Sequence, residues 1–274
     1  MGIESRVNGD GLGAADHVCQ RRIRGPRVNG VRIDPVDAQR FLGVVDDFLA
    51  CGRGTGNAHV VHFCAAHPTV EARHDPGYRE LLNQGDLNVA DGMPVAWAAR
   101  RRGQPTLRLA GTDGMETLCA WGIPRGLRHY LYGATDDTLV AMRTNLERRY
   151  PGILIVGTES PPFRAIADEE LDETVSRMRA AEADAVWIGL GAPKQEVMGA
   201  RLRERDAAPL LFAVGAAFDF IAGTKERAPR WMQRYGLEWM HRLGSEPGRL
   251  WQRYLVGNAR FVAGVARDRL RGQT

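Results

Sequence analysis

The spacing of apolar and polar residues alternates between two patterns along this chain. Short apolar runs rich in Val, Ile and Leu are followed by longer stretches in which apolar residues recur every three to four positions. The first pattern is typical of buried strands, and the second is typical of helices with one apolar face. Strands that alternate with helices of this length predict βαβ units and a mostly parallel sheet.

The predicted fold class is therefore α/β, with a Rossmann-like sheet and flanking helices. The expected strands are residues 28–33, 59–63, 87–90, 129–132, 153–156, 185–188 and 210–214. The expected helices are residues 35–51, 71–83, 94–102, 112–121, 136–149, 168–181 and 194–205. We expect Asp34 to cap the first helix, with Pro35 at its first position.

The length of 274 residues suits one α/β domain with an appendage. Residues 1–26 are polar and glycine-rich, and we expect them to form a flexible tail. We expect residues 27–224 to form the α/β core and residues 225–274 to form a basic helical appendage. No apolar run approaches the roughly 18 residues that a membrane span requires.

Positive charge is concentrated at the C-terminus. The whole chain has a formal net charge of +4, whereas residues 225–274 contain eleven Lys or Arg and four acidic residues, a balance of +7. A localised basic segment indicates an anionic partner.

The last expected helix, from Pro247 to about Arg269, combines arginines on one face with an apolar stripe. These residues are Arg249, Arg253, Arg260 and Arg267, and Trp251, Leu255 and Val262. A basic amphipathic helix with a tryptophan is typical of a membrane surface. A solvated arginine face whose apolar side packs on the core has the same pattern, so the residues alone leave both open.

The residues that follow the expected strands are the candidate site, because open parallel sheets bind ligands beyond the carboxyl ends of their strands. They include Asp91, Gly133, Gly157, Gly189, Gly191 and Asp219. Glycine permits tight turns and close approach of the backbone to a ligand. The segment 189–191 also opens a helix, which makes it a candidate phosphate loop or, equally, a structural turn.

Several motifs occur together in the order of one known family. They are Asp91-Gly92-Met93, Gly111-Thr112-Asp113, GLGAPKQE at 189–196, Phe218-Asp219, RAPxW at 227–231, and GLEW, R, EPxR and RY between 236 and 254. The chain, over about residues 28–260, resembles the WecG/TagA/CpsF glycosyltransferases. The resemblance implies transfer of a sugar from a nucleotide sugar, usually a UDP-sugar, to a polyprenyl-diphosphate-linked saccharide. It also implies inversion at the anomeric carbon, no metal or other cofactor, and work at the cytoplasmic membrane face during bacterial cell-surface polymer synthesis.

The resemblance also implies roles for individual residues. Asp91 matches the general base that an inverting transfer needs, although a carboxylate here is also a candidate N-cap for the helix near Pro94. Gln195 resembles the family's substrate-contacting glutamine, and Asp219 matches the carboxylate that contacts the nucleobase. Phe163 is a candidate to stack near the base, or equally a core aromatic.

The leaving diphosphate needs cations or N–H donors where no metal is present. The candidates are Arg108, the loop 189–191 and the C-terminal arginines Arg242, Arg249 and Arg253. We expect a UDP-sugar, a lipid-linked acceptor and an anionic membrane surface as partners, and no nucleic acid. A homo-oligomer is compatible with the sequence.

One stretch departs from the family pattern. Family members often carry Thr-x-Asn after the strand that ends near His62, whereas this chain has Phe63-Cys64-Ala65. Two polar groups that would hold the sugar near the base are therefore absent. Either His62 or His67 replaces them, or the donor sugar differs from that of other family members.

Two other classes of protein fit parts of the sequence. A nicotinamide or adenosine-cofactor enzyme would share the sheet, but no GxGxxG follows the first strand. A nucleic-acid-binding protein would explain the basic C-terminus, but not the two carboxylates Asp91 and Asp219.

Overall fold

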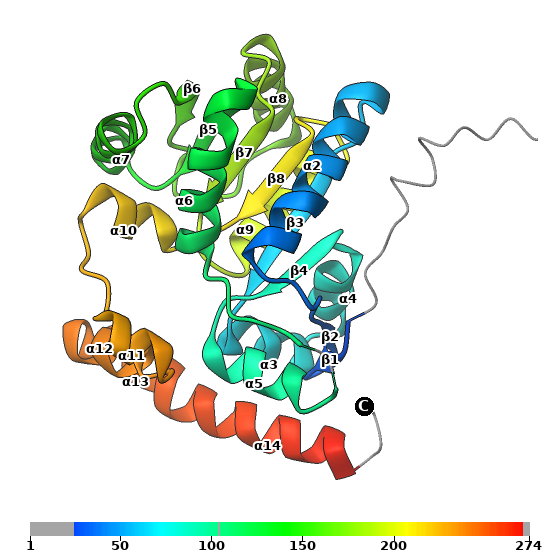
Figure 1. The fold of residues 1–274 in the computed structure, drawn as a ribbon, viewed down its shortest axis with the longest axis vertical. Helices are drawn as coiled ribbons and strands as arrows, with labels where there is room; N and C mark the ends of the chain where they lie inside the picture. Colours follow the sequence, from blue (N-terminus) through cyan, green and yellow to red (C-terminus); the bar gives the residue numbers. More distant parts are fainter. Residues whose placement is uncertain (1–24, 104, 271–274) are drawn as a thin grey trace, which may run out of the picture.

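A six-stranded sheet forms the centre of the computed structural model, which describes residues 25–103 and 105–270 (Figure 1). Each strand is parallel to its neighbours, in the order β4-β3-β8-β7-β5-β6. The strands are β3 (His59–Cys64), β4 (Leu87–Ala90), β5 (Arg128–Gly133), β6 (Leu154–Glu159), β7 (Ala185–Gly189) and β8 (Leu210–Ala213). The predicted α/β fold with a parallel sheet is confirmed.

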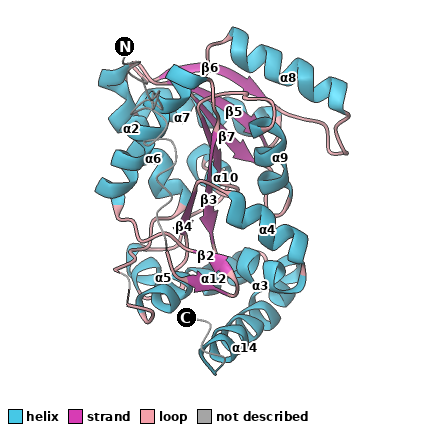
Figure 2. Cartoon of the chain, turned by 90° about the vertical axis from the view of Figure 1, so that its right-hand side faces the viewer, coloured by secondary structure: helices cyan, strands magenta, loops and turns pink. Residues whose placement is uncertain are grey.

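Helices cover both faces of this sheet (Figure 2). One face carries α2 (Ala38–Thr55), α6 (Gly111–Gly122) and α7 (Asp136–Arg149), and the other carries α8 (Asp168–Ala180) and α9 (Lys194–Arg203). Successive strand residues point to opposite faces, so Val61 packs in the first core and Val60 in the second. Burial on both faces explains why the strands read as continuous apolar runs.

A third apolar cluster lies beyond β4 and joins α3 (Ala66–His74), α4 (Pro76–Gln84) and α5 (Met93–Arg100). The predicted strand 28–33 is wrong, because this segment forms a two-stranded antiparallel hairpin of β1 (Arg27–Val28) and β2 (Val31–Arg32). Asn29 and Gly30 turn the chain with φ of 53° and 85°. Asn-Gly is the preferred pair for such a turn, so the sequence carried a signal for the hairpin.

The cap predicted for the first long helix is also wrong. Asp37 caps α2, and its Oδ1 accepts a hydrogen bond of 2.8 Å from the Arg40 N–H. Asp34 is buried instead, where it pairs with Arg32 at 2.9 Å and accepts a bond of 2.8 Å from the Asn88 N–H. Asp34 therefore ties the hairpin to β4.

The predicted helix 71–83 is divided into α3 and α4. Asp75 ends the first helix and caps the second, where Pro76 occupies the first position. The remaining core elements begin and end within four residues of the predicted ranges.

Short helices follow the sheet after α10 (Ala217–Ala222). They are α11 (Arg230–Arg234), α12 (Glu238–Ser245), α13 (Pro247–Trp251), a π-helical turn (Gln252–Val256) and α14 (Gly257–Leu270). In Figure 1, α14 runs beneath α3 and α5. Phe261 joins the third cluster, and the buried Asp268 pairs with Arg73 at 2.6 Å and Arg102 at 3.6 Å. The last helix of the basic segment, α14, is therefore packed on the core.

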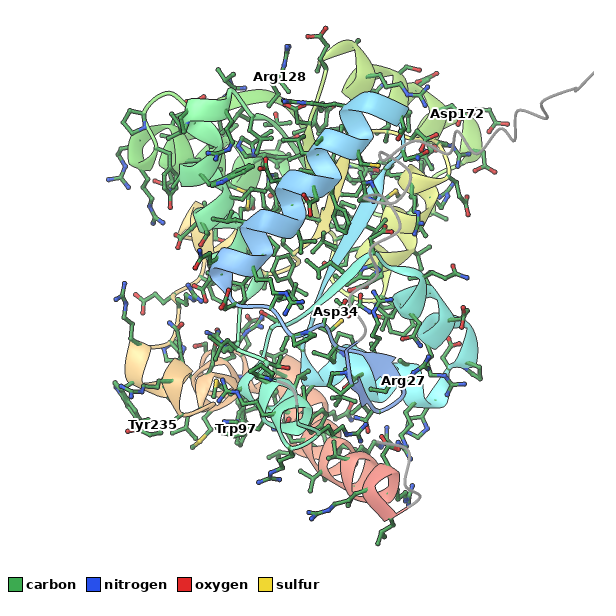
Figure 3. The ribbon with its side chains drawn as sticks, turned by 45° about the vertical axis from the view of Figure 1, so that its right-hand side comes forward. Arg27, Asp34, Trp97, Arg128, Asp172 and Tyr235 are labelled. Carbon is green, nitrogen blue, oxygen red and sulfur yellow. The ribbon has the colours of Figure 1, made fainter. Side chains whose placement is uncertain are left out.

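The turn between α11 and α12 packs against α5. Tyr235 and Trp97 lie at the same edge of the molecule (Figure 3). Gly236, with φ of 70°, comes so close that an added Cβ would lie 3.0 Å from the Trp97 ring. This contact places α12 above the carboxyl ends of the strands.

Candidate active site

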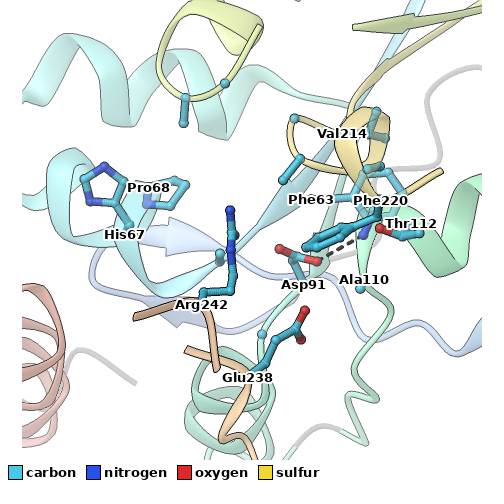
Figure 4. A pocket seen from close by; sticks show the side chains of 18 of the residues that line it. Phe63, His67, Pro68, Asp91, Ala110, Thr112, Val214, Phe220, Glu238 and Arg242 are labelled. Atoms are coloured by element: carbon cyan, nitrogen blue, oxygen red, sulfur yellow. Dashed lines mark hydrogen bonds between the residues drawn. The ribbon is translucent and has the colours of Figure 1, made fainter. Parts of the chain in front are cut away.

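A pocket of about 620 Å³ opens at the carboxyl ends of the strands. Its lining comes from the turns after β3, β4, β5, β7 and β8, and from α12 and the π-helical turn on the opposite side. Open parallel sheets bind ligands at this edge, and the volume suits a small-molecule site. Figure 4 shows Asp91, Glu238 and Arg242 pointing into the same space.

Asp91 stands directly after β4 and remains accessible from the pocket. Its Oδ1 accepts a hydrogen bond of 3.0 Å from the N–H of Gly111, the first residue of α6 (dashed in Figure 4). The alternative N-cap role on α5 does not occur, because Gly92 holds that position and no side chain caps it. Asp91 thus faces the pocket from a fixed position.

Burial raises the pKa of Asp91 to about 6. The Arg108 guanidinium and the Gly111 N–H lower this pKa, whereas the carboxylates of Glu238 and Asp113 raise it. A carboxylate with this pKa is ionised at neutral pH and is still basic enough to accept a proton in a transition state. The environment therefore suits a general base.

Arg108 is already bound to two carboxylates. Its guanidinium lies 2.7 Å from Glu238 Oε2 and 3.4 Å from Asp113 Oδ2, and Asp113 also pairs with Arg227 at 2.7 Å. These ion pairs join the start of α6 to the C-terminal segment. Arg108 therefore has a structural role in these ion pairs, which its position in the sequence did not indicate.

The side chain of Arg242 enters the pocket (Figure 4). Its guanidinium carbon lies 5.6 Å from the centre of the Phe220 ring, and no ion pair joins it to another residue in the described ranges. The side chains of Arg249 and Arg253 lie outside the described part of the structure. Arg242 is therefore the C-terminal arginine whose position supports a diphosphate contact.

The loop after β7 is held in shape by Gln195. Its Oε1 accepts a bond of 3.1 Å from the Gly191 N–H, and its Nε2 donates a bond of 2.9 Å to Glu196 Oε1. Gly191 adopts φ of 74° with open space around it, as close approach of a ligand requires. Gln195 is almost fully buried, so the structure shows it supporting the loop.

Two glycines lock this loop against the turn after β8. A Cβ on Gly189 would lie 2.6 Å from the Phe218 ring, and one on Gly215 would lie 2.9 Å from Gln195 Oε1. Gly215 also has a positive φ of 54°. We refer to Gly189, Gly191, Gln195, Gly215 and Phe218 as the interlocked wall.

Gly133 and Gly157 are not among the residues that line the pocket. Strand β6 continues to Glu159, so Gly157 lies within the strand, where an added Cβ would collide with the Tyr130 ring. A Cβ on Gly133 would lie 2.6 Å from the Gly189 carbonyl oxygen on the neighbouring strand, and Ala134 lines the pocket in place of Gly133. Packing between strands accounts for both glycines.

Asp219 lines the pocket from α10, as expected from its position after the last strand. The Lys225 ammonium lies 2.9 Å from its Oδ2 and 3.2 Å from Glu246 Oε1. Phe163 also lines the pocket and is 86% exposed, which excludes the core alternative for this ring.

The end of β3 presents short and apolar groups. Phe63 lines the pocket while its ring packs 6.0 Å from that of Phe41, and Ala65 is the N-cap of α3 without a capping side-chain bond. His67 lines the pocket from the first turn of α3. Burial lowers the pKa of His62 to about 4, and this side chain lies outside the pocket lining.

Glu238 and Lys225 were not among the sequence candidates. Glu238 belongs to the GLEW motif, but its pairing with Arg108 spans 130 positions and cannot be derived from local spacing. In the sequence, only the GLEW motif indicated that Glu238 is a functional position.

Comparisons with known proteins identify the family of this chain. Residues 26–274 match the model of the glycosyl transferase WecG/TagA/CpsF family. A relative from Bacillus spizizenii, named N-acetylglucosaminyldiphosphoundecaprenol N-acetyl-beta-D-mannosaminyltransferase, is 30% identical over 193 residues, 69% of this chain and 73% of the relative. These matches set aside the nicotinamide-enzyme and nucleic-acid alternatives. The chain belongs to the WecG/TagA/CpsF family and is a glycosyltransferase.

Proposed function

We propose that this chain transfers a sugar from a UDP-sugar to a polyprenyl-diphosphate-linked N-acetylglucosamine, with inversion, during bacterial cell-surface polymer synthesis. The name of the Bacillus spizizenii relative supports this acceptor. The observation that carries the proposal is the Asp91 carboxylate, with a pKa of about 6, which points into the same pocket as Arg242 (Figure 4). Sugar transfer from a diphosphate requires a base and a cation in one site.

In the proposed reaction, the acceptor hydroxyl attacks the anomeric carbon from the face opposite the leaving diphosphate. Asp91 takes the hydroxyl proton as the new carbon–oxygen bond forms. The bond between the anomeric carbon and the phosphate oxygen breaks, and UDP leaves with its electron pair. Arg242 and N–H groups of the 189–191 loop stabilise the charge that develops on that oxygen.

Residues at the rim supply nucleotide recognition in this proposal. Asp219 accepts hydrogen bonds from the nucleobase or ribose, and the exposed Phe163 ring stacks on the base. The apolar surface of Phe63 and Ala65 faces the donor sugar.

The direct test is a transfer assay with a short-chain polyprenyl-diphosphate N-acetylglucosamine and a panel of UDP-sugars. We expect UDP release coupled to a disaccharide product whose new linkage has the opposite anomeric configuration to the donor, as read by NMR. Retention of configuration would contradict the single-base mechanism. UDP release in a control reaction without acceptor would identify simple donor hydrolysis.

Chelation of metal ions is expected to leave activity intact. Because Arg242 and loop N–H groups contact the diphosphate in the proposal, the initial rate in excess EDTA should stay within about twofold of the rate with Mg²⁺. A metal-dependent glycosyltransferase assayed in parallel provides the control. A rate that disappears with EDTA and returns with Mg²⁺ or Mn²⁺ would show that a cation holds the diphosphate.

We further propose that the protein binds peripherally to the anionic cytoplasmic face of the membrane. None of the described helices combines the length and apolar character needed to cross a bilayer. The predicted apolar stripe faces outward, since Trp251, Leu255 and Val262 are 48%, 54% and 66% exposed. Arg260 and Arg267 are exposed as well, while Phe261, Gly264 and Asp268 face the core. An outward face of this kind supports membrane contact.

Reversing two outward charges should weaken vesicle binding. The double variant Arg260→Glu/Arg267→Glu is expected to bind anionic vesicles at least about tenfold more weakly, because each basic residue near the surface contributes about 1 kcal/mol. Co-sedimentation at several salt concentrations measures this effect, and Arg40→Glu/Arg148→Glu on α2 and α7 is the matched control. Truncation of the C-terminal segment is a less suitable test, because it would also remove the ion pairs of Asp268 with Arg73 and Arg102. Unchanged binding of the double variant would contradict the proposed membrane face.

A further inference from the structure

Asp91 shares the pocket with a second carboxylate that comes from a distant part of the chain. Glu238, at the start of α12, points into the pocket beside Asp91 (Figure 4). Arg108 stands with them, 2.7 Å from Glu238 Oε2, and interacts electrostatically with Asp91. The candidate base therefore lies next to an ion pair, one member of which belongs to the C-terminal segment.

The C-terminal segment is fixed over the pocket by three such pairs. Besides Arg108–Glu238, Arg227 lies 2.7 Å from Asp113, and Lys225 lies 2.9 Å from Asp219. Each pair joins a residue of the segment to a residue at the edge of the sheet. Arg108 and Glu238 are both largely buried, so solvent screens this pair less than it screens a surface pair.

Glu238 and Arg242 are four residues apart on α12, so both side chains project from one face of the helix. That face is the one that lines the pocket. The position of α12 consequently sets where Glu238 stands relative to Asp91 and where Arg242 stands relative to a diphosphate.

We propose that Glu238 is a positioning residue for sugar transfer: it binds Arg108 so that α12 stays over the pocket, and it keeps a negative charge beside Asp91. The inference rests on the proposed role of Asp91 as general base. Glu238 does not take a proton from the acceptor and acts on the reaction through Arg108 and Asp91.

The charges around Asp91 explain how Glu238 affects its basicity. Arg108, from the segment before α6, and the Gly111 N–H favour the ionised carboxylate, while Asp113 on α6 and Glu238 on α12 disfavour it. Cys64, at the end of β3, is a buried thiol whose raised pKa leaves it neutral, and Arg242 faces the same pocket. Without Glu238, Asp113 would be the remaining carboxylate among these groups that opposes the effect of Arg108, and Asp91 would become a weaker base.

The test compares the pH dependence of kcat/KM for the wild type and Glu238→Gln. Glutamine keeps an oxygen that can accept from Arg108 but removes the charge. Loss of a negative neighbour stabilises ionised Asp91 and lowers its pKa. The acidic limb of the pH profile of kcat/KM should therefore move to lower pH by roughly half a unit or more. The plateau rate should fall a few-fold as the base weakens.

Two further variants separate charge from attachment. Glu226→Gln removes the same charge from an exposed position of the same segment, and its limb should coincide with that of the wild type. Glu238→Ala removes the attachment as well, so its affinity for UDP should fall about tenfold as Arg242 loses its place. Circular dichroism spectra of all variants establish that the fold is retained.

An acidic limb that stays at the wild-type pH in Glu238→Gln overturns the inference, even if the rate falls. The proposed function is tested separately by Asp91→Asn, since full activity of that variant would remove the base without reference to Glu238. A shifted limb in Glu238→Gln together with an inactive Asp91→Asn supports both.

Discussion

Asp91→Asn should lower kcat by about 10²–10⁴-fold while the affinity for UDP stays within about twofold of the wild-type value. The amide cannot take the acceptor proton, but its oxygen can still accept the hydrogen bond from the Gly111 N–H. The geometry of the site is therefore retained while the chemistry is lost. Steady-state kinetics and calorimetric titration with UDP measure the two quantities.

The stability of this variant separates lost chemistry from lost structure. The pKa of Asp91 is about 6 in the folded protein, above the value of about 3.9 for an unfolded aspartate. The folded state therefore binds this proton more tightly, and the free energy of unfolding falls as pH rises from about 4 to 6. Asparagine carries no such charge, so Tm at pH 8 should not fall. Asp46→Asn, on the exposed face of α2, is the control, and near-normal turnover of Asp91→Asn would remove Asp91 from the mechanism.

Arg242→Ala should lower kcat/KM by about 10²–10³-fold, the usual effect of removing one donor from a developing negative charge. Its guanidinium enters the pocket, whereas Arg108 and Lys225 are already paired with carboxylates. UDP should also bind more weakly, because in the proposed mechanism the same group contacts the diphosphate of the product. Inhibition by UDP provides that measurement.

The matched control is Arg234→Ala, an exposed arginine on α11 in the same basic segment. It removes the same charge from a side chain that does not line the pocket, so its kinetics should resemble those of the wild type. Equal losses in both variants would mean that the overall charge of the segment matters, and that Arg242 makes no specific diphosphate contact.

The sheet could be predicted from the sequence because its strands are buried on both faces. Runs such as 185–188 contain little besides apolar residues, and that pattern depends on local burial alone. Capping was harder, because Asp34 and Asp37 both precede an apolar helical pattern. The contact of Asp34 with the Asn88 N–H, 54 residues away, decides between them, and no local pattern predicts it.

The same distinction applies to the site. Asp91 and Asp219 were found because each follows a strand, and strand ends are readable from sequence. Gly157 was misplaced because β6 runs further than its apolar residues indicate. The pairing of Arg108 with Glu238 depends on how the C-terminal segment folds back, which no local pattern records.

The interlocked wall limits where the pocket of this enzyme can change. A side chain at position 189 or 215 would collide with Phe218 or Gln195, so that side has a single shape unless the backbone moves. At the turn after β3, Ala65 lines the pocket with a small side chain that makes no capping hydrogen bond, and it lies outside the interlocked wall. Since we propose that this turn faces the donor sugar, redesign of donor specificity should begin at Ala65 and leave the interlocked wall unchanged.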